Sequence, residues 1–199
     1  MEEEDDEEDG GDEEGHEDGG RDSPEYDEHV WTSPKNAKLI VAEIADALCE
    51  ADAANEGHYR QSAAEYIGQL NKLDAEFQAV VDGAIRKTIV FGDRFPFRYF
   101  ADAYQLEYFA AFPGCSTETE PSAKTVTFLV DKIKDEQIPV IFHIELSNEK
   151  MADTISTETG AKKQLLHACH NISKDDFQTG LGYLDLMTRN VEALREALY

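Results

Sequence analysis

Positively charged residues are scarce in this sequence. It holds 18 Lys and Arg against 43 Asp and Glu, which gives a formal net charge of −25 over 199 residues. A chain with this balance repels the phosphates of nucleic acids, so we expect no nucleic-acid partner. The acidic excess fits cations as partners, or simple solubility.

Long hydrophobic runs are also missing. No apolar stretch approaches the roughly 20 residues that a transmembrane helix needs. The N-terminus is anionic, the opposite of a signal peptide. We therefore expect no direct insertion of this chain into a membrane and no export signal within it.

Cysteine is sparse as well. Three residues, Cys49, Cys115 and Cys169, do not make a disulfide framework and do not indicate a redox compartment. Cys49 lies in a helical pattern, where we expect a small core residue. Cys115 and Cys169 follow predicted strands and leave three alternatives open: zinc thiolates, a disulfide, or buried thiols, with the buried thiols favoured.

The acidic residues are concentrated at the N-terminus. Residues 1–28 contain 17 Asp and Glu against one Arg, a net charge of −16, so the rest of the chain carries only −9. A low-complexity segment of this kind buries too little apolar surface to offset the cost of ordering, and residues 1–25 are predicted to be disordered and dispensable for folding. Weak capture of cations by its carboxylates and His16 is the alternative.

Helical periodicity begins just after this tail. Ser33 is placed to cap a helix and Pro34 suits its first position. Apolar residues Ile40, Ile44 and Leu48 recur every four positions, with Val41 and Ala45 beside them, which predicts a helix over 34–53. A second helix is predicted over 57–85, and a last one runs from Ser173 to the C-terminus.

Between these helices, short apolar runs alternate with helical patterns. The runs at 88–91, 108–112, 138–142 and 163–166 are predicted strands. Repeated strand–helix units predict an α/β fold with a parallel four-stranded sheet flanked by helices on both faces. Ligands of such sheets bind beyond the carboxyl ends of the strands. Here those ends are 92–93, 114–115, 143–145 and 167–170.

Metal-capable side chains stand at several of these places. His29 lies on a loop beside Asp27, and a neighbouring carboxylate can fix the tautomer of a metal-binding imidazole. Asp93 could bind a metal or form an ion pair with Arg94. Glu145 could bind a metal or cap the next helix, and His167 could be a ligand or a surface histidine.

The segment Asp27-Glu28-His29-Val30-Trp31-Thr32-Ser33-Pro34 resembles a known signature. Zinc- and manganese-specific solute-binding proteins of ABC importers carry Asp-Pro-His-Ile-Trp-Leu-Ser-Pro, whose histidine binds the metal. The resemblance implies an extracytoplasmic receptor, membrane-tethered or periplasmic, that captures Zn²⁺ or Mn²⁺ between two lobes and delivers it to a membrane permease. We expect this chain to be a second-lobe fragment that begins inside the acidic loop of the first lobe, with a long linking helix.

The resemblance also implies a ligand set of His29, Asp93, Glu145 and His167. His167 stands where many relatives have a ligating Asp, and histidine and aspartate both bind Zn²⁺. The family usually has a ligating histidine after the first strand of this lobe, but this sequence has Gly92 there. Either Asp93 takes the role, or Glu145, His143 or Cys115 does, or the site has been lost.

Three segments and one main function follow from these observations. The acidic tail covers 1–25, the ligand loop and linking helix cover 26–56, and an α/β metal-binding lobe covers 57–199. The expected function is metal capture without catalysis. A zinc hydrolase with Glu145 as general base is an alternative, although no His-Glu-x-x-His motif is present. An acidic interaction module without metal is another.

Overall fold

A four-stranded parallel sheet lies at the centre of the fold. The computed structural model describes residues 27–112 and 121–199. The strands are β1 (Thr88–Phe91), β2 (Glu107–Ala110), β3 (Val140–His143) and β4 (Lys162–Leu165), in the order β2-β1-β3-β4 with parallel pairing throughout. The predicted α/β class and parallel sheet are confirmed. The predictions for residues 1–25 and Cys115 lie outside the described residues.

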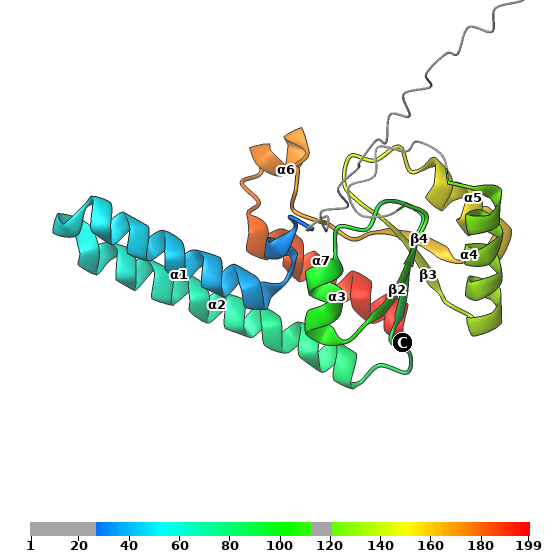
Figure 1. Ribbon diagram of the computed structural model, residues 1–199, viewed down its shortest axis with the longest axis horizontal. Helices are drawn as coiled ribbons and strands as arrows, with labels where there is room; N and C mark the ends of the chain where they lie inside the picture. Colours follow the sequence, from blue (N-terminus) through cyan, green and yellow to red (C-terminus); the bar gives the residue numbers. More distant parts are fainter. Residues whose placement is uncertain (1–26, 113–120) are drawn as a thin grey trace, which may run out of the picture.

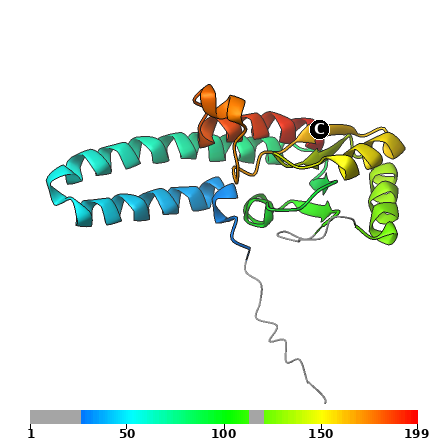
Figure 2. The ribbon, with the colours of Figure 1, turned by 90° about the horizontal axis from the view of Figure 1, so that it is seen from above.

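Two long helices form a hairpin that extends away from the sheet. Helix α1 (Pro34–Ala51) and helix α2 (Glu56–Asp82) lie side by side, with a 3₁₀ turn over Ala53–Asn55 between them (Figures 1 and 2). A further 3₁₀ turn, Val30–Thr32, precedes α1. Among the described helices, none combines the length and apolar composition that a membrane span requires.

Four of the remaining helices cover the two faces of the sheet together with α2. They are α3 (Arg98–Tyr104), α4 (Ala123–Glu136), α5 (Lys150–Thr159) and α7 (Tyr183–Leu198). The short helix α6 (Lys174–Gln178) contributes no residue to either core. Strand side chains alternate between the faces, so Ile89 packs with α2, α3 and α7 while Val90 packs with α4 and α5. The predicted flanking of both faces is confirmed.

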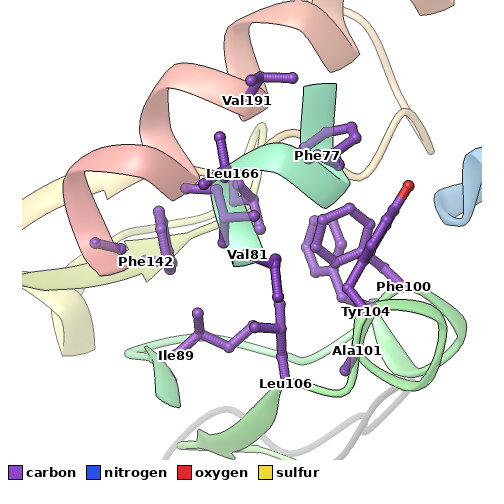
Figure 3. Packing of buried hydrophobic residues seen from close by; sticks show 14 of the residues in the cluster. Phe77, Val81, Ile89, Phe100, Ala101, Tyr104, Leu106, Phe142, Leu166 and Val191 are labelled. Atoms are coloured by element: carbon purple, nitrogen blue, oxygen red, sulfur yellow. The ribbon is translucent and has the colours of Figure 1, made fainter. Parts of the chain in front are cut away.

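The larger of the two cores joins α2, α3 and α7 to the sheet. Figure 3 shows Phe77 of α2 and Val191 of α7 above the strand residues Phe142 and Ile89, with Tyr104 of α3 beside them. These side chains are almost completely buried. This core anchors the inner end of α2 and all of α7, and it supports the strand ends that carry the candidate site.

The apolar stripe of α1 is buried only in part. Ile44 and Leu48 are 54% and 43% exposed, whereas the small residues Ala37, Ala45 and Cys49 are buried. Helix α1 packs chiefly against one neighbour, α2. Small residues let the two helices approach closely, and Ile44 and Leu48 lie on the side that faces away from α2. The prediction that Cys49 is a small buried residue is confirmed.

Two details of helix capping and length also differ from the sequence prediction. Ser33 stands at the N-cap of α1 and Pro34 at its first position, but the Ser33 hydroxyl is buried without a hydrogen-bond partner. Ser173 does cap a helix, because its Oγ accepts a hydrogen bond from the Asp176 N–H at 3.0 Å. That helix is only α6, since Gly180 adopts a positive φ of 76° and breaks the chain before α7.

Candidate metal centre

Two segments that are far apart in the sequence meet at the carboxyl ends of β3 and β4. One is the stretch Asp27–Trp31 before α1, and the other is the loop His167–Asn171 after β4, which we call the His170 loop. The Trp31 indole N–H donates to the Ala168 carbonyl at 2.9 Å. The Tyr183 hydroxyl at the start of α7 donates to the Trp31 carbonyl at 2.7 Å. Figures 1 and 2 show the start of α1 next to this part of the chain.

His29 is buried and held by a carboxylate. Its Nδ1–H donates to Asp27 Oδ1 at 2.9 Å, and the same oxygen accepts the His29 backbone N–H at 2.9 Å. This pairing places the ring proton on Nδ1 and leaves a lone pair on Nε2. Metal-binding histidines are oriented by partners of this kind, which fix the tautomer and raise the basicity of the other nitrogen.

His29 Nε2 faces a second imidazole. It lies 3.2 Å from Nδ1 of His170, and the two ring centroids are 5.3 Å apart. A tetrahedral zinc with Zn–N bonds of about 2.0–2.1 Å holds neighbouring nitrogens about 3.3 Å apart. The pair therefore has the spacing of two ligands of one zinc ion. Within residues 27–112 and 121–199, no group of three or more His, Cys, Asp or Glu side chains is arranged to hold a metal.

Glu145, a predicted ligand, is occupied by backbone amides. Its carboxylate accepts hydrogen bonds from the N–H groups of Ala168 at 2.8 Å, His170 at 2.9 Å and Asn171 at 3.1 Å. The side chain is 6% exposed. Glu145 thus fastens the His170 loop to the end of β3, and its oxygens point at the loop backbone.

His167, another predicted ligand, is buried beside Glu145. Its Nδ1 accepts the Cys169 backbone N–H at 3.0 Å and lies 3.7 Å from Glu145 Oε2. Accepting this bond places the proton of the neutral ring on Nε2. Asn190 of α7 binds both backbone groups of His167, at 2.8 Å each. The imidazole that meets His29 is therefore that of His170, three residues later.

Asp93, the third predicted ligand near the strand ends, ties two strand ends together. Its Oδ1 accepts the Arg94 backbone N–H at 2.8 Å, and its Oδ2 accepts the Ile144 N–H at 3.2 Å. The carboxylate is buried. The guanidinium of Arg94 lies over the ring of Phe112, 6.0 Å from its centroid. Asp93 thus bridges the ends of β1 and β3.

The structure gives a steric reason for the glycine at position 92. A Cβ built on Gly92 would lie 2.5 Å from the Ala152 Cα, 2.8 Å from its N and 2.9 Å from its Cβ. These atoms belong to α5, which packs directly against the end of β1. The space into which a side chain at this position would extend is filled by the helix backbone.

Cys169 lies at the turn of the His170 loop. It is a free cysteine, with a positive φ of 56°. Burial, and to a smaller extent the charge of Glu145, raises the pKa of its thiol to about 12. The thiol is therefore protonated near neutral pH when no metal is bound. Of the three alternatives for this residue, the structure favours the buried thiol.

The residues predicted to bind the metal include His167 and not His170. His167 follows the fourth strand and stands where many members of the resembling family have a ligating Asp, whereas His170 has no such counterpart in the prediction. The His-x-x-His spacing of His167 and His170 was the available signal. The left-handed turn at Cys169, which directs the two rings differently, was not visible in the sequence.

Comparisons with known proteins agree with this picture. The family model described as zinc-uptake complex component A, periplasmic (ZnuA) matches residues 1–197. The high-affinity zinc uptake system protein ZnuA of Bacillus subtilis is 33% identical over 172 residues, which cover 86% of this chain and 53% of that protein. The chain thus spans about half the length of this curated relative.

Solved structures are similar in both sequence and fold. The metal-dependent lipoprotein YcdH of Bacillus subtilis superposes with a TM-score of 0.76 at 33% identity, over 87% of this chain and 65% of that one. The Zn(II)-bound ZnuA-like domain of Streptococcus pneumoniae AdcA gives a TM-score of 0.74 at 30% identity, over 89% and 66%. Both similarities extend over most of this chain.

Proposed function

The chain belongs to the ZnuA family of periplasmic zinc-uptake components, and from this membership we propose that it captures Zn²⁺ outside the cytoplasm for an ABC importer. Its partners are then the metal ion and the membrane permease to which the ion is delivered. Mn²⁺ is the alternative cargo. The proposed division of the chain is a tail (1–25), a ligand loop with linking helix (26–56) and a metal-binding lobe (57–199).

The observation that carries this proposal is the pair His29 and His170. Asp27 orients the first ring, and the two nitrogens are 3.2 Å apart. We assign both rings as ligands, with the other coordination positions filled by water or by groups outside this chain. Glu145, His167 and Asp93 serve the site by holding the strand ends and the His170 loop.

The donor atoms favour zinc over manganese. Imidazole nitrogen suits Zn²⁺, while carboxylate and water oxygens suit Mn²⁺. The two carboxylates that could have supplied oxygen, Asp93 and Glu145, both accept backbone N–H groups. Nitrogen is therefore the ligand that this lobe offers.

The alternatives have less support. A zinc hydrolase needs a general base aimed at a metal-bound water, and the Glu145 carboxylate is directed at the His170 loop. The similar proteins are named for zinc uptake or zinc binding. An acidic interaction module without metal leaves the Asp27–His29–His170 arrangement unexplained.

The proposal is tested by titrating the chain with Zn²⁺ in a calorimeter. Because one lobe supplies only part of the shell, we expect weak binding. His29→Ala and His170→Ala should each raise the dissociation constant at least about tenfold, which is about 1.4 kcal/mol. His58→Ala is the matched control, because His58 is exposed on α2 and should not affect the strand-end site.

The acidic residues 1–28 are common to all variants, so any metal they hold cancels in the comparison. Equal affinities in the wild type and in both site variants would refute the assignment. A chain that binds no Zn²⁺ at all would refute metal capture by this lobe. Selectivity is measured by repeating the titration with Mn²⁺, for which weaker binding is expected.

A further inference from the structure

The His170 loop turns so that three of its amides converge on one buried carboxylate. Cys169 adopts a left-handed conformation with φ 56°, and the N–H groups on either side of it, of Ala168, His170 and Asn171, all point at Glu145. Successive amides in a turn of this type form a concave anion-binding nest. Here the anion is a side chain of the protein itself, supplied from the loop after β3.

The carboxylate and the loop depend on each other. A buried charge is costly unless it is hydrogen-bonded, and the three N–H groups meet this need for Glu145. In return, Glu145 fixes the backbone on both sides of the His170 Cα, because it binds the amide of His170 itself and that of the next residue. The His170 residue is exposed, and its ring contacts the rings of His29 and Trp31, so the loop backbone decides whether the ring reaches them.

We propose that Glu145 is a positioning residue that holds His170 in front of His29 and does not itself bind the metal. The proposal rests on the function proposed above. Glu145 Oε1 accepts two N–H groups and Oε2 accepts a third, so the oxygens are engaged on the loop side. Its effect on zinc then passes entirely through the position of the His170 imidazole.

This mode of action has a distinctive consequence for a double-mutant cycle. If Glu145 acts only through His170, its replacement costs affinity when His170 is present and nothing when His170 is absent. A directly ligating Glu145 would instead lower the affinity in both backgrounds. A carboxylate that only stabilises the fold would also act in both.

The experiment measures Zn²⁺ binding by calorimetry for the wild type, Glu145→Gln, His170→Ala and the double variant. Glutamine keeps the size of the side chain but places an NH₂ donor against at least one loop N–H. Glu149→Gln is the matched control, because it removes the same charge from the same connecting loop while its carboxylate pairs with Lys163. Glu145→Asp, which keeps the charge but is one methylene shorter, is a milder second variant.

We expect Glu145→Gln to weaken Zn²⁺ binding tenfold or more in the wild-type background and less than twofold in the His170→Ala background. Glu149→Gln should leave the affinity within twofold of wild type. A similar loss in both backgrounds, or no loss with His170 present, would overturn the proposal. So would an unchanged affinity in His170→Ala, because His170 would then not be a ligand.

Amide hydrogen exchange, followed by NMR without metal, provides a readout that does not depend on zinc. In Glu145→Gln the amides of Ala168, His170 and Asn171 should exchange at least tenfold faster, while amides of β1 and β3 stay protected. Unchanged exchange at the three loop amides would refute the proposal that Glu145 holds the His170 loop. If the wild type bound no Zn²⁺, the proposed function would fail and the exchange data would still decide whether Glu145 holds the loop.

Discussion

Replacing Gly92 by alanine should destabilise the fold although it adds only one methyl group. The added Cβ would lie 2.5 Å from the Ala152 Cα, where carbon atoms in contact are normally about 3.5–4.0 Å apart. Helix α5 must therefore retreat by about 1 Å from the end of β1. Overpacking of this kind costs about 1–3 kcal/mol, and the smaller conformational entropy of the unfolded chain offsets only about 0.4–1 kcal/mol of it.

The assay is equilibrium unfolding in urea. A net loss of about 1–2 kcal/mol, with a denaturant slope of about 1–3 kcal/mol per molar, shifts the midpoint down by about 1 M. Gly68→Ala is the matched control with the opposite expected sign. Gly68 lies within α2 with no neighbouring atom near its added Cβ, so alanine there should stabilise by about 0.5–1 kcal/mol.

A rescue experiment separates backbone contact from side-chain contact. The two nearest atoms are the Cα and N of Ala152, so Ala152→Gly should not restore the stability of Gly92→Ala. Gly92→His should be still less stable and should not bind zinc more tightly, because α5 fills the space that the ring would need. If Gly92→Ala were as stable as Gly68→Ala, the close approach of α5 would be refuted.

Further predictions concern the core, the loop support and a spectroscopic reporter. Phe77→Ala should cost about 3–5 kcal/mol in urea unfolding, whereas Phe177→Ala should change stability by less than about 0.5 kcal/mol, because Phe77 is fully buried and Phe177 is 72% exposed. Equal losses of stability in the two variants would contradict the burial of Phe77 in the core. Asn190→Ala should cost about 2–3 kcal/mol, because it leaves the backbone N–H and C=O of buried His167 without their partner; a neutral effect would contradict this role. Trp31 is the sole tryptophan, and its ring centroid is 5.4 Å from that of His29, so its fluorescence should change during a Zn²⁺ titration. A flat signal with saturating calorimetric binding would place the ion elsewhere.

Much of the fold was predictable because the two central strands, β1 and β3, carry a strong local signal. The run Thr88–Phe91 ends in three apolar residues, as expected for a strand covered on both faces, and all four of its residues are buried. The outward face of α1 was not predictable in the same way. Its apolar residues lie on more than one side, and only the position of α2 decides that Ala45 is buried while Ile44 is exposed.

The candidate site shows the same division between local and distant information. His29 and its partner Asp27 are two residues apart, and the motif around them pointed to both. The role of His170 depends on a left-handed turn at Cys169 and on Glu145, which is 25 residues away in the sequence. Residue spacing carries no information on such a turn, so the sequence pointed to His167, directly after the strand, and not to His170.

The most direct test of the account is a crystal structure of the zinc-soaked chain with anomalous data collected at the zinc absorption edge. The account predicts one strand-end peak within about 2.0–2.1 Å of both His29 Nε2 and His170 Nδ1, the bond length of zinc to imidazole nitrogen. Glu145 should still bind the amides of the His170 loop. A zinc peak coordinated by Glu145, His167 or Asp93, with no bond to His29, would contradict it.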